Sequence, residues 1–371
     1  MNEQHFIGLM SGTSLDGVDA VLADFSDGRV RVLAHAHQAF EPALSTELLA
    51  LNSAGANELH RAALASNALV RVYARAVDEL LRTSGMATTQ VRAIGAHGQT
   101  VRHRPREFDG TGYTLQLNSP ALLAELSRID VVADLRSRDV AAGGQGAPLV
   151  PAFHRAVFAV PDATVAVLNL GGIANVTLLH ADGRTMGFDC GPGNLLMDHW
   201  CALHLGKPYD DGGAWAASGQ VDAALLAQLL AEPYFAWPAP KSTGRDLFHA
   251  EWLQAQLQRR SAALRPEDVQ ATLAELTAAS CAQDVLRAAP TAAELLVCGG
   301  GAFNTHVMQR LDAHLPRLRV QRTDARGLPA MQVEACAFAW LARAFCERQH
   351  GNLASVTGAR GGRVLGALYP A

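Results

Sequence analysis

Residues 12–19 combine groups that bind an anionic oxygen with groups that bind a divalent cation. Their glycines leave backbone N–H groups unhindered and their hydroxyl side chains add donors, which suits a phosphate group. Their aspartates would repel a bare phosphate, so they fit best if Mg²⁺ lies between carboxylate and phosphate. We therefore expect a phosphate loop with Asp16 or Asp19 as metal ligand; the alternative is a plain hairpin turn with Asp-Gly at its tip. The predicted loop consists of Gly12, Thr13, Ser14, Leu15, Asp16, Gly17, Val18 and Asp19.

Two later glycine clusters also follow apolar, strand-like stretches. The first repeats the strand, turn, strand pattern and could close on phosphates from the other side. The second precedes a helical pattern, so its backbone could approach an adenine or ribose, with Asn304 as helix N-cap or ligand donor. The clusters are Gly171 with Gly172, and Gly299, Gly300 and Gly301.

Two common nucleotide-binding motifs are missing from the chain. GxxxxGK[ST] does not occur, and Lys241 in PKSTGRDLF (240–248) follows no apolar strand and lacks the leading glycine. The glycine clusters also lack the GxGxxG spacing, and the acidic residue about 20 positions on, that a dinucleotide site needs. A Walker-type lysine and a Rossmann dehydrogenase are therefore disfavoured.

Helical patterns separate the glycine-terminated stretches. Apolar residues recur at intervals of three and four over 57–83 and 267–288. Strands alternating with helices predict an α/β fold, and a length of 371 residues favours two domains. We place the boundary in the hydrophilic stretch that starts at Arg136, which gives domains over 1–135 and 136–345. Residues from about 345 to 371 are expected to pack on the first domain.

Composition removes several classes of function. The chain has 31 Lys+Arg against 35 Asp+Glu, a net charge of −4, which offers no broad basic surface for nucleic acid. No basic segment leads into an apolar run at the start, and no stretch reaches the roughly 18 apolar residues of a membrane span. We therefore expect a soluble, cytoplasmic protein that binds no membrane. The six cysteines form no CxxC pair or Cys/His cluster, which favours buried thiols over zinc or disulfides.

With these elements in this order, the chain resembles the actin/hexokinase/Hsp70 superfamily of two-domain phosphotransferases. Within it, the chain is similar over nearly its whole length to the anhydro-N-acetylmuramic acid kinase family. Eight ordered motifs make this resemblance specific. They are GLMSGTSLDGVD (8–19), AHGQTVRH (96–103), RDVAAGGQGAPLVPAFH (138–154), NLGGIANV (169–176), GFDCGPGNLLMD (187–198), PKSTGR (240–245), CGGGAFN (298–304) and EACAFAWLA (334–342).

The resemblance implies a two-domain actin/hexokinase-like, ribonuclease H-like fold with ATP in a cleft between the domains. It also implies an ATP- and Mg²⁺-dependent kinase that converts 1,6-anhydro-N-acetylmuramic acid to N-acetylmuramic acid 6-phosphate and ADP. Water opens the 1,6-anhydro bond in the same event. Such an enzyme serves peptidoglycan recycling and is often a homodimer, so its partners would be the sugar, ATP and a second copy of the chain.

The resemblance also implies roles for individual residues. Residues 12–19 would bind the ATP phosphates, and Asp189 would be the catalytic base; the alternative for Asp189 is a cap of the helix that starts after Gly193. Glu334 would contact the sugar, although it could equally cap the helical run that follows it. His97 and Gln99 lie after a short apolar strand and could donate to sugar or phosphate.

Two departures from the family pattern bear on these roles. The superfamily usually has an acidic residue on the first strand, where this chain has Leu9 and Met10, so the metal role could have moved to Asp16 or Asp19. In the LRSRD segment a serine replaces an expected middle arginine. Arg136 and Arg138 must therefore share or divide the binding of the sugar's lactyl carboxylate, a group that suits a guanidinium fork. Arg138 could instead pair with its neighbour Asp139.

Two rival functions stay open at this point. In another sugar or small-molecule kinase of the superfamily, Asp189 would deprotonate a substrate hydroxyl and no bond would be hydrolysed. In a non-catalytic, nucleotide-dependent regulator, ATP hydrolysis would be slow and independent of any sugar.

Overall fold

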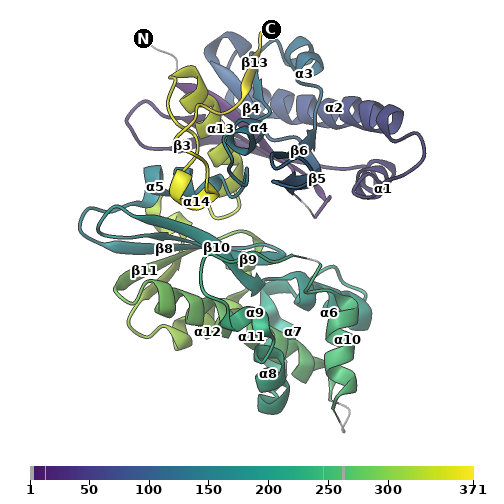
Figure 1. Ribbon diagram of the computed structural model, residues 1–371, viewed down its shortest axis with the longest axis vertical. Helices are drawn as coiled ribbons and strands as arrows, with labels where there is room; N and C mark the ends of the chain where they lie inside the picture. The colour runs from purple at the N-terminus through teal and green to yellow at the C-terminus, as the bar shows by residue number, and fades with distance from the viewer. Residues whose placement is uncertain (1–3, 13, 245, 261–263) are drawn as a thin grey trace. The chain divides into compact units, whose positions relative to one another are not determined.

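The computed structural model describes residues 4–12, 14–244, 246–260 and 264–371 (Figure 1). Their contacts divide the chain into two compact units. Unit 1 comprises residues 1–157 and 332–371, and unit 2 comprises residues 158–331. Each unit is a sheet packed against helices, so the α/β class is confirmed.

The sheet of unit 1 has six strands in the order β13-β7-β4-β1-β2-β3. Strands β4 and β7 run parallel to the central strand β1, and β2 pairs antiparallel with both β1 and β3. Strands β5 and β6 form a separate antiparallel hairpin. The strands are β1 (His5–Met10), β2 (Gly17–Asp24), β3 (Arg31–Ala39), β4 (Ala93–Ala96), β5 (Gln99–Pro105), β6 (Gly112–Leu117), β7 (Val131–Ala133) and β13 (Ala367–Tyr369).

Alternate residues of β1 face two different helices. Ile7 and Leu9 belong to the hydrophobic core that includes Leu69 and Tyr73 of helix α2. Gly8 points to the opposite face, because successive side chains in a strand alternate. A Cβ on Gly8 would overlap the backbone of helix α13, and one on Gly95 of β4 would do the same. Glycine at both positions therefore lets α13 lie directly on the sheet. The helices of unit 1 are α1 (Pro42–Ala50), α2 (Glu58–Ser84), α3 (Pro120–Ser127), α4 (Ser137–Ala141), α5 (Val150–Phe158), α13 (Val333–Cys346) and α14 (Ala354–Thr357).

Unit 2 repeats the strand order of unit 1. Its sheet runs β10-β9-β8-β11-β12, with β9 antiparallel to both neighbours and β11 and β12 parallel to β8. The same order, β3-β2-β1-β4-β7, occurs in unit 1. This duplicated topology is ribonuclease H-like, as the resemblance predicted. The strands are β8 (Thr164–Leu170), β9 (Ile173–Leu179), β10 (Thr185–Pro192), β11 (Ala292–Cys298) and β12 (Arg319–Arg322).

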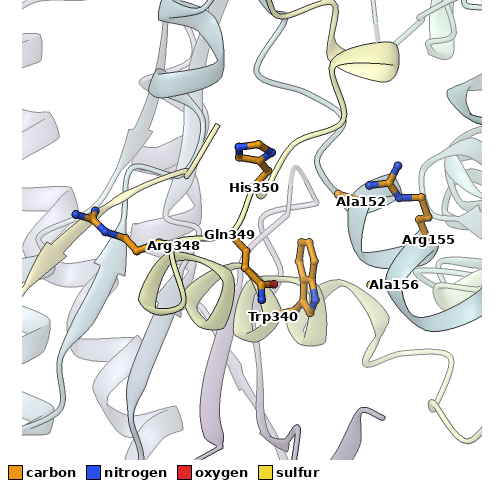
Figure 2. A pocket seen from close by; sticks show the side chains of 7 residues that line it. All are labelled: Ala152, Arg155, Ala156, Trp340, Arg348, Gln349 and His350. Carbon is orange, nitrogen blue, oxygen red and sulfur yellow. The ribbon is translucent and has the colours of Figure 1, made fainter. Parts of the chain in front are cut away.

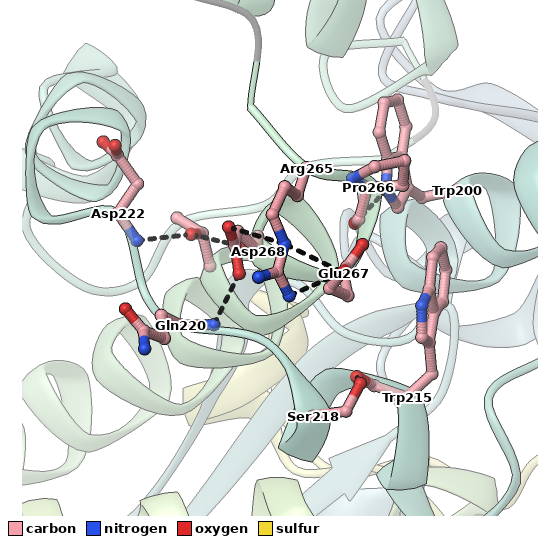
Figure 3. A network of polar contacts seen from close by, with 10 residues as sticks. Trp200, Trp215, Ser218, Gln220, Asp222, Arg265, Pro266, Glu267 and Asp268 are labelled. Carbon is pink, nitrogen blue, oxygen red and sulfur yellow. Dashed lines mark hydrogen bonds and ion pairs between the residues drawn. The ribbon is translucent and has the colours of Figure 1, made fainter.

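Helix α11 is the longest helix in the described part of unit 2, and polar contacts fix its first turns (Figure 3). Trp200 Nε1 donates to Pro266 O (2.8 Å), and Asp268 Oδ1 accepts from Gln220 N (2.8 Å). Farther along, Thr277 Oγ1 donates to Gly193 O (2.9 Å), which ties the helix to the end of β10. The helices of unit 2 are α6 (Leu195–Leu205), α7 (Ala214–Ser218), α8 (Ala223–Leu230), α9 (Pro233–Ala236), α10 (Ala250–Gln258), α11 (Pro266–Ala288) and α12 (Thr305–His314).

The units meet along the chain at residues 157/158 and 331/332, whereas the sequence placed the boundaries near 136 and 345. Packing explains the difference at both places. The buried carboxylate of Asp139, in α4, accepts hydrogen bonds from Asn352 Nδ2 (2.5 Å) and Thr357 Oγ1 (2.7 Å), so α4 belongs with the C-terminal segment. Helix α13 lies on β1 and β4, which brings it into unit 1 from its first residue.

The other expectations from composition concern cysteines and membranes. Among the described residues no disulfide joins any of the six cysteines; five are buried and Cys346 is half-buried, as expected. Over the described residues, no helix combines the length and the apolar character needed to cross a bilayer.

Replacement of either sheet glycine should weaken unit 1. We expect Gly8→Ala and Gly95→Ala each to lower the free energy of unfolding by about 1–3 kcal/mol or more, since an inserted methyl group must displace helix backbone. Denaturant titration measures the change. Gly55→Ala is the matched control, because a Cβ there would approach only the flexible end of Arg61, at 3.2 Å. A Gly8→Ala protein as stable as this control would contradict the packing.

Candidate active site

The loop between β1 and β2 is held by side chains from other elements. Gly12 O accepts from Gln99 Nε2 (3.1 Å) at the start of β5, and Leu15 O accepts from Ser45 Oγ (2.8 Å) in α1. A Cβ on Gly12 would meet only Ser14 Oγ, at 3.7 Å, so its backbone faces open space. The remaining residues of the predicted loop lie in different environments. Leu15 packs on the hydrophobic core, Val18 lies within it, Gly17 makes room for β3, and Thr13 lies outside the described residues.

The two candidate metal ligands lie in different environments. Asp16 is exposed, and its Oδ1 accepts from Ser14 Oγ (2.7 Å). Asp19 is half-buried on β2, and its Oδ1 lies 3.0 Å from His37 Nδ1 and 3.6 Å from His35 Nε2. Burial raises the pKa of Asp19, but the contacts with the two histidines outweigh it and hold the pKa below its usual range. An ionised carboxylate with its second oxygen outside these contacts suits Mg²⁺, which needs only one or two carboxylates besides water and phosphate oxygens. Within the described ranges, no group of three or more His, Cys, Asp and Glu side chains forms a metal site by itself.

Arg136, His97 and Glu334 come together in unit 1 from distant parts of the chain. Arg136 donates through Nη2 to His97 Nε2 (2.8 Å) and through Nη1 to Gly146 O (2.8 Å). His97 Nδ1 contacts Ser11 O (3.2 Å), so both ring nitrogens are occupied and the imidazole is neutral. Burial, then the charge of Arg136, hold the pKa of His97 well below its ordinary value.

Opposing charges surround the Glu334 carboxyl. Burial and the nearby Asp19 carboxylate raise its pKa, while the Arg136 guanidinium lowers it. Burial lowers the pKa of Arg136 to about 10, with Glu334 and Asp139 acting in the other direction. The guanidinium is therefore charged at neutral pH and sits beside a carboxyl whose proton affinity is enhanced. Helix α13 begins one residue before Glu334, so the carboxyl stands in its first turn.

Arg138 lies apart from this cluster. It is exposed on α4, and among the described residues no ion pair joins it to Asp139, which was the expected alternative. Asp139 instead accepts from Gly146 N (2.8 Å), besides Asn352 and Thr357. Of the two candidate arginines, the fold brings only Arg136 beside Glu334 and His97.

Asp189 lies near the end of β10, where the chain segment after Lys241 meets it. Its Oδ2 accepts from Ser242 Oγ (2.9 Å) and Thr243 N (3.1 Å). Burial raises the pKa of Asp189, and these two hydrogen bonds oppose the increase without cancelling it. The register of β10 shifts directly after Asp189, at Gly191, whose φ of 138° favours glycine. A half-buried carboxylate with a raised pKa is suited to accept a proton.

The helix-cap alternative for Asp189 does not hold. Helix α6 starts at Leu195, with Asn194 as the residue before it, five positions beyond Asp189. Asn194 instead links the two glycine clusters of unit 2. Its Nδ2 donates to Leu170 O (3.0 Å), and a Cβ on Gly301 would lie 2.8 Å from its Oδ1.

The glycines of these clusters serve two purposes. Added Cβ atoms at Gly171, Gly172 and Gly300 would meet nothing closer than 3.6 Å, so their backbones are open to a ligand. Gly299 has a φ of 80°, and Gly301 is packed against Leu170, so these two are required by the turn itself. Both clusters follow parallel strands at their carboxyl ends, where ligands of open α/β sheets bind. Asn304 caps α12, its Oδ1 accepting from Val307 N (3.0 Å).

Several residues that contact the candidate site residues were not predicted from the sequence. Ser242 and Thr243 stand in the recognised PKSTGR motif, and that motif was the available signal for them. The motif's Arg245 lies outside the described residues. No local sequence pattern identifies Tyr234, whose OH donates to Asp189 O (2.6 Å). The same holds for His35 and His37, which lie beside Asp19.

A cavity of about 490 Å³ in unit 1 is separate from these groups (Figure 2). None of the predicted site residues lines it, and Figure 2 shows the side chains that do. Its lining residues are Ala152, Arg155, Ala156, Trp340, Arg348, Gln349 and His350.

Comparison with known proteins covers the whole chain. A family model described as Anhydro-N-acetylmuramic acid kinase matches residues 4–371. A protein of that name from Variovorax paradoxus is 64% identical over 371 residues, covering 99% of this chain and 99% of the relative. Others from Albidiferax ferrireducens and Cupriavidus metallidurans are 61% and 60% identical, covering 99% and 100% of this chain and 99% and 98% of the relatives. With this match and the site geometry, the chain belongs to the anhydro-N-acetylmuramic acid kinase family.

Proposed function

We propose that this protein is an ATP-dependent kinase that phosphorylates 1,6-anhydro-N-acetylmuramic acid and opens its anhydro ring in the same event. The products are N-acetylmuramic acid 6-phosphate and ADP, and the reaction serves peptidoglycan recycling. The family match over residues 4–371 carries this proposal. The half-buried carboxylate of Asp189, with its raised pKa, supports it from the chemistry of the site.

In the proposed reaction, Asp189 removes a proton from the attacking water. The water oxygen bonds to the anomeric carbon, and the bond from that carbon to O6 breaks. O6 then bonds to the γ-phosphorus of ATP, and the bond from that phosphorus to the bridging oxygen breaks to release ADP. Asp189 ends the step protonated, and its proton passes to solvent. General-base assistance of this kind contributes about 10²–10⁴ in rate.

Arg136 and Glu334 are the proposed sugar contacts. The guanidinium offers the two-pronged donor set that a lactyl carboxylate accepts. Glu334, whose pKa is raised, accepts a hydrogen bond from a sugar hydroxyl. His97 orients Arg136, because its two ring nitrogens are occupied by protein groups. Gln99 fixes the Gly12 carbonyl.

The ATP contacts in this proposal come from the glycine-bearing turns. The predicted phosphate contacts are backbone N–H groups of the loop before β2 (Gly12 and Ser14 to Asp16) and of Gly171 with Gly172, whereas Gly17, Val18 and Asp19 belong to strand β2. Gly299–Gly301 lie against the nucleoside. Mg²⁺, when bound to the phosphates, neutralises charge that develops on them; Asp16 or Asp19 would hold it. A homodimer and a cytoplasmic location complete the proposal and rest on the resemblance.

The decisive assay for the proposed function compares ATP consumption with and without 1,6-anhydro-N-acetylmuramic acid. We expect turnover to depend on the sugar, and reaction in H₂¹⁸O to place one ¹⁸O at the anomeric carbon of the product. An unlabelled phosphorylated product would favour the rival sugar kinase. ATP hydrolysis that ignores the sugar would favour the regulator, and either result would overturn the proposal.

Asp189→Asn should remove the base without disturbing the nucleotide site. We expect kcat to fall by at least about 10²-fold while the Kd for ATP stays nearly unchanged. Steady-state kinetics and calorimetric titration with ATP measure the two quantities. A variant that retains more than about a tenth of the wild-type kcat would exclude Asp189 as the base.

The two candidate arginines should separate in their KM for the sugar. Arg136→Ala removes a charge-assisted contact worth about 1.5–3 kcal/mol, so its KM should rise by roughly tenfold to a hundredfold. Arg138→Ala, on the exposed face of α4, should leave KM within about twofold of wild type. Thermal unfolding of both variants controls for stability, since Arg136 also donates to Gly146 O. The opposite ranking of the two KM values would assign the contact to Arg138.

A further inference from the structure

Lys241 and Asp284 form an ion pair in the interior of unit 2. Lys241 Nζ lies 2.9 Å from Asp284 Oδ2, and the two side chains are only 2% and 6% exposed. The ammonium group also lies 4.8 Å from the centre of the Tyr234 ring. Because desolvation of two charges offsets much of their attraction, such a pair contributes little net stability by itself. Neither group takes part in the proposed reaction steps.

The backbone around Lys241 contacts Asp189 on several sides. Asp189 N donates to Lys241 O (3.0 Å), as a strand pair would. The next two residues, Ser242 and Thr243, supply both hydrogen bonds to the Asp189 carboxylate. Tyr234, beneath the Lys241 ammonium, donates to Asp189 O (2.6 Å). The side chain of Lys241 thus points inward from the same segment whose outer groups hold the carboxylate.

Asp284, the partner of Lys241, lies on a helix that several other contacts hold in place. Asp284 belongs to α11, whose first turns are held by the contacts shown in Figure 3. Thr277 of the same helix donates a hydrogen bond to Gly193 O. The thiol of Cys281, also on α11, contacts the Cys190 thiol directly after Asp189. Helix α11 and the end of β10 therefore form one framework, and segment 241–243 crosses it without belonging to a helix or strand.

We propose that Lys241 is a positioning residue for Asp189: its buried ion pair with Asp284 anchors segment 241–243 so that Ser242 and Thr243 hold the Asp189 carboxylate. This inference rests on the proposed function of Asp189 as the base. Loss of the anchor leaves the carboxylate without fixed donors, so it both loses its orientation and gains proton affinity. Misplacement of a reacting group by about 1 Å can cost on the order of 10² in rate.

The titratable and charged groups that face Asp189 come from four elements. They are Cys190 on its own strand, Tyr234 in α9, Lys241 in the crossing segment, and Cys281 and Asp284 in α11. Contact with Cys281, then burial, raise the pKa of Cys190 well above its ordinary value, and burial also raises that of Tyr234, so both stay neutral near pH 7. Of these groups, Asp189 is the proposed base, so its ionisation sets the acid limb of the activity profile. Hydrogen-bond donors to its carboxylate lower its pKa.

The test replaces both charges, because a single lost charge could unfold the unit. In Lys241→Met/Asp284→Leu we expect kcat to fall at least about tenfold, with KM for ATP within about twofold of wild type. The acid limb of the kcat against pH profile should move to higher pH by about one unit, since a hydrogen bond to a charged group is worth roughly that much. Lys241→Gln, which keeps a neutral donor for Asp284, should shift both quantities in the same direction by less.

The matched control removes another ion pair made by α11, between the buried Glu275 of α11 and the partly exposed Arg310 of α12. Glu275→Gln/Arg310→Met replaces a pair in which Arg310 Nε lies 2.5 Å from Glu275 Oε2, away from Asp189. We expect this control to change the melting temperature but neither kcat per folded enzyme nor the acid limb. If a folded Lys241 variant retained the wild-type kcat and acid limb, or behaved like the control, the positioning role would be overturned. Absence of sugar-dependent turnover in the wild-type enzyme would instead be a failure of the proposed function.

Discussion

Direct contact between helix backbone and strand backbone is the constraint on which unit 1 depends. Gly8 and Gly95 stand side by side on adjacent parallel strands, and α13 lies where their side chains would be. This contact makes residues 332–346 part of unit 1, although 174 residues of unit 2 separate them from Val157. It also sets the first turn of α13, with Glu334, next to Arg136 and near Asp19. The cluster of Arg136, His97 and Glu334, which we propose as the sugar contact, therefore depends on the absence of side chains at Gly8 and Gly95.

The acidic groups of the two units show how burial and hydrogen bonding compete. Burial acts on Asp19, Asp189 and Glu334 in the same direction, because low polarity disfavours a charged carboxylate. Two histidines reverse its effect on Asp19, two donors only reduce it on Asp189, and Arg136 opposes it on Glu334 without reversing it. Asp19 is therefore held ionised, whereas the proposed base Asp189 and the proposed sugar contact Glu334 both have a raised proton affinity.

Much of the fold followed from local patterns. Strand ends followed by glycines and long stretches of helical periodicity identified an α/β chain, and the eight motifs between residues 8 and 342 pointed to the family. The boundary near 136 was misplaced because α4 looks like a hydrophilic linker in sequence, whereas its Asp139 is buried against Asn352 and Thr357. Such a contact spans more than 200 residues, and no local pattern reports it.

By itself, the sequence determined which chemical groups this protein has at its strand ends: carboxylates, glycine backbone and guanidinium groups, in an order specific enough to predict the family. Local rules suffice for this, because turns and periodicity depend on neighbouring residues. Only the tertiary structure decided which of these groups act together. It placed Arg136, and not Arg138, beside His97, whose two ring nitrogens both contact protein groups. It also brought Ser242 and Thr243 within hydrogen-bond distance of the Asp189 carboxylate. The physical reason is that proximity across the chain depends on the packing of whole helices on sheets, which spacing along the chain does not encode.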